Sequence, residues 1–388
     1  MTAEEPRAQR GRAWLGRALA LACCAVFLSW VAGFYHPRFG FSAFLMITRD
    51  GEDSQLPVLQ TIPHYRYPAG HGYDGGMYVQ IAMVPLLRDP VIDRTLDAPA
   101  YRARRILFCW TAYALGLGRP AWIMQAYALQ NVICWLLLAW LVTRWFPLDG
   151  ARMLALWAGS MFSHGLITSV RLAVLDGPSL LLLACAVALA ERGRTFWTAM
   201  VLGAAGLGRE TNLLGATALP WPQGWRGWLR AAVAGVIVIL PLLVWQDYLW
   251  SIYRGTSVTD GAGHITVPFT AYLAKWRETL RDPGAAGWLA TIQQVLVIVA
   301  LTVQAAYIAW TRRWQAPWWR LAAAFAVLLF AVHGAVWSGI PGAITRVTLP
   351  LKFGFNVLLA RDQPRAFWAW AVLGNLDLAM SGEVLPFT

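Results

Sequence analysis

Long apolar runs alternate with short polar segments along most of this chain. A helix needs roughly 20 consecutive, mainly apolar residues to cross a bilayer. The pattern predicts an all-α polytopic membrane protein with about 10 to 11 transmembrane helices in a single integral membrane domain, residues 1–388. The apolar runs cover residues 14–34, 121–143, 152–168, 178–191, 195–219, 231–250, 287–311, 318–338, 344–360 and 366–380.

Arginines in the short polar segments indicate an orientation in the membrane. Cytoplasmic loops are enriched in Lys and Arg, and the arginine-bearing segments fall inside if residues 1–13 form a cytoplasmic N-terminus. Two conditions apply: residues 101–118 lie along the outer face, and residues 195–219 form a hairpin that turns near Arg209 and Glu210. In the alternative, 101–118 crosses and the loops before residue 195 are inverted. The inward arginines are Arg144, Arg152, Arg192, Arg194, Arg226, Arg230, Arg312, Arg313, Arg320, Arg361 and Arg365.

Three polar pieces then face outward. Residues 35–120 form a long first periplasmic loop with amphipathic surface helices, residues 169–177 a short turn, and residues 251–286 a second large periplasmic loop. Arginine-rich loops inside and a long first outer loop are typical of a bacterial inner-membrane protein whose active face is periplasmic.

The composition agrees with this class. Hydrophobic residues make up 58% of the chain and charged residues 13%, against roughly 25% charged residues in soluble domains. The net charge of +12 does not indicate nucleic-acid binding, because the arginines are spread over short segments and form no basic domain. The cysteines lie inside apolar runs without metal-ligand spacing, so they are interpreted as small buried hydrophobes: Cys23, Cys24, Cys109, Cys134 and Cys185.

One polar stretch of the first outer loop, HGYDGGMYVQIA at residues 71–82, combines an acid with three glycines. Met77, Ile81 and Val84 have helical spacing, which predicts a surface helix with Asp74 just before its first turn. Asp74 suits a helix-capping role there. It equally suits a general base that deprotonates an acceptor hydroxyl, with the glycines allowing a substrate to approach the backbone.

The same stretch resembles a known family. GYDGGMYVQIA is similar to the G-Y-D-G-Q-F-Y-x-x-I-A segment of bacterial GT-C-type polytopic membrane glycosyltransferases, among them a family linked to cell-surface glycopolymer formation. The resemblance extends in order and spacing over roughly residues 60–375. The sequence departs from the pattern at Gly76 and Met77, where Gln and an aromatic residue are usual. Further matching segments are YRARRIL, LAERGRTFWTAMVLGAAGLGRETNLLG and TRVTLPLKFGFNVLL.

The resemblance implies a GT-C-like helical bundle whose first outer loop carries an essential acid. It implies a polyprenyl-phosphate sugar as donor, a glycan or lipid acceptor, and inversion at the anomeric centre. Asp74 corresponds to the catalytic base, and Tyr73 and His71 are candidate substrate contacts beside it. No cofactor beyond the lipid-linked donor is expected. A metal has no support, because there is no Asp-x-Asp motif and the acidic residues 50–53 are interpreted as a solvated loop.

Two further polar sites lie in apolar surroundings. Arg209 and Glu210 interrupt an apolar run, where ionisable residues line a cavity or form a pair. They are either an ion pair that closes the hairpin, or a phosphate-binding arginine with an acid that orients it or binds the acceptor sugar. Asp176, in the outer turn before Pro178, is either a substrate contact or a helix cap.

The remaining candidates are cations that would bind a lipid phosphate. Arg346 lies about one turn inside a late apolar run, and Lys352 lies deeper, where it would otherwise snorkel or pair with a buried acid. Arg105, with its neighbours Arg102 and Arg104, lies on the outer side against the positive-inside trend. Phosphate headgroups would explain this placement, as would ordinary lipid contact.

These residues also suit two other functions. A flippase or exporter of lipid-linked glycans needs intramembrane charges, and so does a non-catalytic subunit of a polysaccharide assembly complex. The polar candidates gather near the outer leaflet instead of spreading across the membrane, which favours the glycosyltransferase. The expected partners are the lipid-linked sugar donor, the acceptor and membrane lipids.

Overall fold

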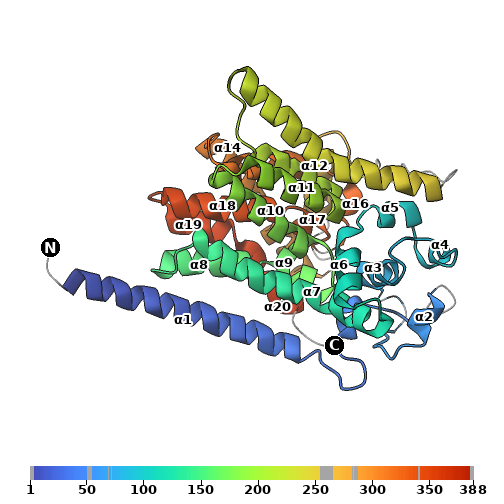
Figure 1. Cartoon of the computed structure of the whole chain (residues 1–388). Helices are drawn as coiled ribbons and strands as arrows, with labels where there is room; N and C mark the ends of the chain where they lie inside the picture. The colour runs from blue at the N-terminus through green and yellow to red at the C-terminus, as the bar shows by residue number, and fades with distance from the viewer. Residues whose placement is uncertain are drawn as a thin grey trace. The chain divides into compact units, whose positions relative to one another are not determined.

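The computed structural model describes residues 4–49, 55–68, 70, 72–253, 265–281, 283, 287–339 and 341–384. Within these ranges the chain is helical and forms no β-strand; three isolated β-bridges join His36 to Gly40, Thr48 to Tyr67 and Ile265 to Val332 (Figure 1). The chain groups into two compact units. One comprises residues 1–32, 136–168 and 264–388, and the other residues 33–135 and 169–263.

The unit of residues 33–135 and 169–263 combines short helices with longer apolar ones. Helices α7 (Pro120–Leu141) and α9 (His164–Arg171) cross the boundaries between the two units. The remaining elements of this unit are η1 (Ser42–Leu45), α2 (Pro57–Gln60), α3 (Asp74–Met83), α4 (Ile92–Thr95), α5 (Pro99–Ala103), α6 (Leu107–Leu115), α10 (Asp176–Glu191), α11 (Thr195–Gly208), η4 (Glu210–Ala218) and α12 (Gly224–Ile252).

The other unit is built around α18 (Leu349–Asp362), most of whose residues are buried. Gly354 lets α18 approach its neighbour closely, because a Cβ there would lie 3.0 Å from the Trp318 carbonyl oxygen. The other elements are α1 (Glu4–Ala32), η3 (Val142–Arg144), α8 (Ala151–Met161), α13 (Thr270–Arg281), α14 (Trp288–Thr311), α15 (Pro317–Ala331), α16 (Gly334–Trp337), α17 (Ile344–Val347), α19 (Phe367–Leu373), η6 (Leu376–Met380) and α20 (Ser381–Val384).

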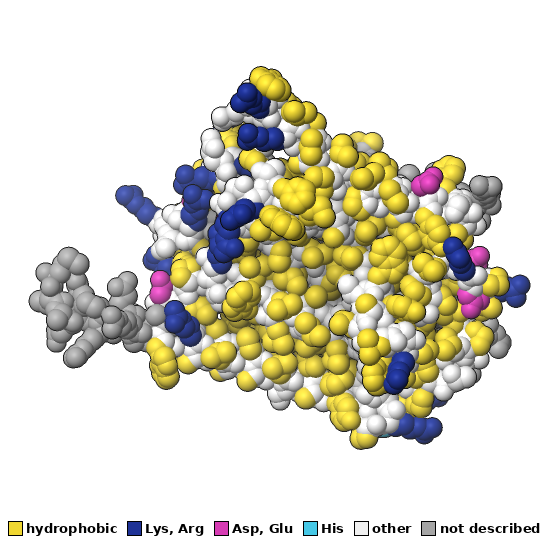
Figure 2. Space-filling model, in the orientation of Figure 1, with side chains coloured by type: hydrophobic (Ala, Val, Ile, Leu, Met, Phe, Trp, Pro, Cys, Tyr) yellow, Lys and Arg dark blue, Asp and Glu magenta, His cyan; other side chains and the backbone are white. Residues whose placement is uncertain are grey.

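Four helices in the described residues are long and apolar enough to cross a membrane, or five if the bent pair α8 and α9 forms one span. Exposed apolar side chains follow α12, and hydrophobic side chains cover much of the face drawn in Figure 2. Such surfaces are typical of contact with lipid. The four spans are Trp14–Ala32, Pro120–Arg144, Gly224–Ile252 and Trp288–Thr311.

Fewer helices reach this length than the apolar runs predict. Helix α10 has 16 residues, α11 has 14 and α15 has 15, and 16 residues rise only about 24 Å. Several runs are divided because polar or helix-breaking residues end a helix inside them. The run 152–168, for example, breaks after Met161 and resumes at His164 with a bend of 42°. The mean hydropathy of a run of about 20 residues stays high across such a break, so it does not reveal where a helix ends.

Two segments on which the predicted topology depends are broken into short helices, which agrees with the local part of that prediction. Residues 101–118 form no single spanning helix: α6 has nine residues, a rise of about 14 Å against a bilayer core of about 30 Å. Helix α11 ends at Gly208, Arg209 is extended at φ −164°, and η4 begins at Glu210. The two arms pack together, because a Cβ on Gly206 would lie 3.0 Å from the Leu213 side chain.

Candidate functional site

Asp74 is the first residue of α3. The residue before it, Tyr73, is the N-cap, with extended backbone at φ −145° and no side-chain capping hydrogen bond. The sequence predicted Asp74 as the N-cap, with the helix beginning after it; in the structure the helix begins at Asp74 itself. The carboxylate of Asp74 lies in the first turn, where it interacts favourably with the positive end of the helix dipole.

The glycines after Asp74 allow α3 to pack against protein backbone. A Cβ on Gly75 would lie 2.6 Å from the carbonyl oxygen of Leu172 and 3.1 Å from that of Leu45. One on Gly76 would lie 3.3 Å from the Ile47 side chain. The predicted role of these glycines, to admit a substrate, does not fit Gly75, because backbone already occupies the space beside it. The small size of Gly75 instead allows the start of α3, where Asp74 lies, to pack closely against the turn that follows α9.

Arg102, in α5, joins two acids. Its Nη1 lies 3.0 Å from Asp74 Oδ1, while its Nε and Nη2 donate to the two oxygens of Asp97 at 2.9 and 2.8 Å. The guanidinium also lies over the ring of Tyr78, 5.7 Å from its centroid. Bidentate pairing of this kind fixes the plane of the guanidinium, so Asp97 sets the direction from which Arg102 holds Asp74.

Arg105, one turn further along the chain, holds a third acid, Glu210. Its Nε donates to Glu210 Oε2 at 3.1 Å, and its terminal nitrogens donate to the hydroxyls of Tyr78 at 3.2 Å and Tyr101 at 2.5 Å. Tyr78 therefore touches both arginines, through its ring and through its hydroxyl. We call Asp74, Tyr78, Asp97, Tyr101, Arg102, Arg105 and Glu210 the acid–arginine cluster.

Asp74 and Glu210, two of the three acids in the cluster, are partly open. The side chain of Asp74 is 30% exposed and that of Glu210 is 26% exposed. One oxygen of each is held by an arginine. The other oxygen of Glu210, Oε1, is buried and has no hydrogen-bond partner among the described residues. Buried polar atoms are nearly always hydrogen-bonded, so Glu210 Oε1 is an acceptor whose hydrogen-bonding capacity the described residues leave unused.

Burial and neighbouring charges shift the pKa values of three cluster residues, Asp97, Arg102 and Tyr78, which lie outside the membrane-spanning helices. Hydrogen bonds from Arg102 lower the pKa of Asp97. Burial alone lowers the pKa of Arg102, but the hydrogen bonds to Asp97 and the charge of Asp74 raise it above its ordinary value. Burial raises the pKa of the Tyr78 phenol, so this group remains a neutral hydrogen-bonding partner.

Arg209 and Glu210 each form an ion pair with a residue elsewhere in the chain. Arg209 forms an ion pair with Asp176, the first residue of α10, whose side chain is only 5% exposed. Asp176 is not the N-cap of α10, since that position is Leu175. The two neighbours in sequence thus connect the hairpin break to two different elements, Glu210 to Arg105 and Arg209 to the start of α10.

Arg346 and Lys352 belong to the other compact unit. Arg346 is buried in α17. Lys352 is buried in α18 and forms an ion pair with the buried acid Asp377 of η6. Of the roles predicted for this lysine, the structure shows the pairing with a buried acid. His71 and the acidic residues 50–53 lie outside the described residues, and Tyr73 is half-buried.

Three members of the cluster were not singled out from the sequence, Tyr78, Asp97 and Tyr101, and Arg102 was named only as an outward-facing neighbour of Arg105. Two of them carry a local signal. Tyr78 follows Asp74, and Arg105 follows Tyr101, by four residues, the spacing that places side chains on one face of a helix. The contacts of Arg102 with Asp74 and of Arg105 with Glu210 join distant positions, and no local spacing indicates them.

No group of three or more His, Cys, Asp or Glu side chains in the described ranges is placed to hold a metal ion. No protein-family model, curated protein or solved structure matches this chain. The geometry of the acid–arginine cluster is therefore the main indication of function.

Proposed function

We propose that this chain is an integral membrane glycosyltransferase of the GT-C type. It moves a sugar from a polyprenyl-phosphate donor to a glycan or lipid acceptor, with inversion at the anomeric carbon and Asp74 as general base. The observation that carries the proposal is the state of Asp74: Arg102, which also pairs with Asp97, holds one carboxylate oxygen of Asp74 at 3.0 Å, and the Asp74 side chain remains 30% exposed.

The proposed reaction is a single displacement. Asp74 accepts the proton of the acceptor hydroxyl, whose oxygen forms a bond to the anomeric carbon of the donor sugar. The bond from that carbon to the phosphate oxygen breaks, and polyprenyl phosphate leaves with the electron pair. Positive side chains aimed at a departing anion supply a large share of catalysis in such sites. Arg105 and Arg209 are the candidates for this task.

Glu210 supports a role in sugar binding. Arg105 holds its Oε2 at 3.1 Å, while its buried Oε1 has no hydrogen-bond partner in the described part of the chain. A sugar hydroxyl would donate to that oxygen and complete its coordination. Such a bond would orient the acceptor or donor ring, because Arg105 donates to the carboxylate and is itself held by the hydroxyls of Tyr78 and Tyr101.

The setting that we propose is the periplasmic face of a bacterial inner membrane, within a bundle of about 10 to 11 helices, some shorter than a full span. A lipid-linked donor suits this location, since nucleotide sugars are not available outside the cytoplasm. The apolar helices support the membrane setting by their length and composition.

The proposal is tested with the full chain in proteoliposomes. Polyprenyl-phosphate hexoses and pentoses are supplied with candidate acceptors, and the release of polyprenyl phosphate and the anomeric configuration of the product are measured. The expected result is a glycoside of inverted configuration, formed in step with free polyprenyl phosphate. If the donor instead crosses the bilayer intact, the chain is a flippase and the proposal is wrong. Donors that neither react nor cross would also contradict it.

A further inference from the structure

Exposed aromatic and basic side chains adjoin each other at the start of α12. Trp225, Trp228 and Leu229 lie on one side of its first turns, and Arg226 and Arg230, four residues apart, lie on another. All five side chains are exposed. The guanidinium of Arg226 also lies over the ring of Trp225, 5.4 Å from its centroid. A helical segment with an apolar side and a basic side is typical of the boundary between lipid and water.

Two glycines shape this helix start. Gly224, the first residue of α12, has φ +62°, a left-handed conformation that other residues rarely adopt. A Cβ on Gly227 would lie 3.3 Å from the backbone carbonyl carbon of Pro222. The segment before α12 therefore folds back against the first turn, and it brings the exposed ring of Trp221 to the same place.

The uncharged stretch of α12 begins directly after these residues. Residues 231–246 carry no charge and lie between Arg230 and Asp247. They rise about 24 Å, slightly less than the roughly 30 Å of the apolar core of a bilayer. Charged and aromatic residues that flank such a stretch meet the lipid headgroups. The start of α12 therefore lies at the level of the headgroups when the helix crosses a membrane.

The turn before α11 adds two more arginines to the same end of this unit. Helix η4 runs back along α11, since a Cβ on Gly215 would meet the side chain of Leu202, so the chain returns toward the start of α11 before α12 begins. Arg192 and Arg194 are exposed there, and the adjoining Glu191 offsets one charge. We call four residues the basic end: Arg192, Arg194, Arg226 and Arg230.

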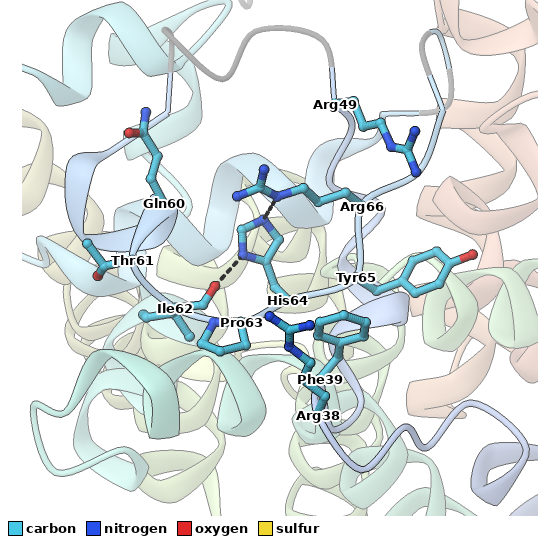
Figure 3. A pocket seen from close by; sticks show the side chains of 10 residues that line it. All are labelled: Arg38, Phe39, Arg49, Gln60, Thr61, Ile62, Pro63, His64, Tyr65 and Arg66. Atoms are coloured by element: carbon cyan, nitrogen blue, oxygen red, sulfur yellow. Dashed lines mark hydrogen bonds between the residues drawn. The ribbon is translucent and has the colours of Figure 1, made fainter.

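Other arginines of this unit are held by protein groups. Arg102 and Arg105 bind carboxylates of the acid–arginine cluster. Beside the cavity drawn in Figure 3, Arg66 Nε donates to His64 Nε2 at 3.3 Å. The basic end differs, because its side chains are exposed and adjoin exposed tryptophans. It is therefore open to a charged surface outside the protein.

We infer that the basic end binds the anionic phospholipid headgroups of the membrane that holds this chain. A membrane surface attracts each basic side chain near it, so the four guanidinium groups need not converge on one point. Tryptophan rings favour the same level of the bilayer. The surface is separate from the acid–arginine cluster, because Glu210 follows the far end of α11, about 20 Å from its start.

The inference rests on the membrane setting of the proposed function and not on sugar transfer. Its test is lipid binding by the purified full chain in neutral detergent. Phosphatidylglycerol, which is anionic, and phosphatidylcholine, which has no net charge, are titrated separately at low and high salt. Native mass spectrometry counts the bound lipids. Because transfer is not measured, a failure here leaves the proposed reaction standing.

Two variants that remove equal charge are compared. The variant R226Q/R230Q removes two arginines of the basic end. The control R88Q/R94Q removes two exposed arginines that follow Leu86, whose carbonyl oxygen accepts from the Tyr248 hydroxyl near the other end of α12 at 2.7 Å. Matching unfolding temperatures verify that both variants are folded.

We expect the wild type to prefer phosphatidylglycerol, with a preference that salt weakens. R226Q/R230Q should bind this lipid roughly 25-fold more weakly, since each basic side chain near an anionic surface contributes about a factor of five. Its binding of phosphatidylcholine should not change, and R88Q/R94Q should match the wild type. No lipid preference in the wild type, or equal losses in both variants, would overturn the inference. So would lost self-association of R226Q/R230Q with unchanged lipid affinity, which would assign the surface to a second copy of the chain.

Discussion

Two groups of acids and cations in this chain differ in how far they are closed. In the acid–arginine cluster, Asp74 and Glu210 are 30% and 26% exposed, and each uses one oxygen for an arginine. In the other unit, Lys352 and Asp377 pair with side chains only 4% and 6% exposed. Both groups contain residues in apolar surroundings that the sequence marks as candidates. Only the first leaves carboxylate oxygens available to another molecule.

The surroundings of the closed pair explain the difference. Asn356 and Asn375 exchange two hydrogen bonds of 3.0 Å, and Asn356 also donates to Ser160. This amide pair connects α18 to the start of η6, where Asp377 lies. Lys352 and Asp377 thus belong to a polar interior network that joins helices. We interpret the closed pair as structural and the acid–arginine cluster as the site of chemistry.

The largest effect on stability should come from opening the closed pair. Lys352→Met leaves Asp377 buried without its cation, and breaking a buried pair in this way costs about 3–5 kcal/mol. The double variant Lys352→Met/Asp377→Leu removes both charges and should recover most of the loss. Thermal unfolding in detergent measures both. Equal destabilisation by the single and double variants would show that the ion pair is not the cause.

The next variant, Arg102→Gln, should lower the rate of sugar transfer. Arg102 does not react in the proposed mechanism; it positions Asp74. Misplacing a catalytic group by about 1 Å costs up to roughly 100-fold in rate, so kcat should fall about 10- to 100-fold with little change in KM. Arg102→Lys should recover part of the loss, because a cation remains. Arg94→Gln, in exposed α4, is the matched control, and a similar loss in that variant would contradict the positioning role.

The packing of α3 predicts a third effect. Gly75→Ala forces a Cβ against the Leu172 carbonyl oxygen, 2.6 Å away before relaxation, and such overpacking typically costs about 1–3 kcal/mol. Gly76→Ala meets its nearest atom at 3.3 Å and should be close to neutral. Unfolding temperatures of the two variants measure the contrast. Equal values would mean that α3 does not approach the Leu172 backbone closely.

The smallest effect is a pH dependence at Asp97. Arg102 lowers the pKa of this acid in the folded protein, so its contribution to stability is present above its ordinary pKa, about 3.9. That contribution is lost as the pH falls through the lower folded value. Unfolding temperature should therefore decrease on acidification more steeply in the wild type than in Asp97→Asn. Identical slopes would show that the Arg102–Asp97 bond has no effect on stability.

Local features of the site were predictable from the sequence, whereas its partners were not. The helix after His71 and the break at Arg209 follow from apolar spacing and from charges inside an apolar run. The contact of Arg105 with Glu210 joins positions 105 residues apart, and Asp74 meets Arg102 through the placement of α5 against α3. Such contacts depend on tertiary packing. Helix lengths within the apolar runs escaped prediction for the same reason.

The central claim is tested most directly by one variant, Asp74→Asn, in a single-turnover assay of sugar transfer from the polyprenyl-phosphate donor. Asp89→Asn is the matched control, because Asp89 lies in the same loop and its Oδ1 accepts a local bond from the Val91 backbone N–H. We predict that Asp74→Asn slows transfer by about 10²–10⁴-fold, with donor binding and folding retained, while Asp89→Asn transfers at the wild-type rate. Full transfer activity in a folded Asp74→Asn variant would contradict the claim that Asp74 is the base.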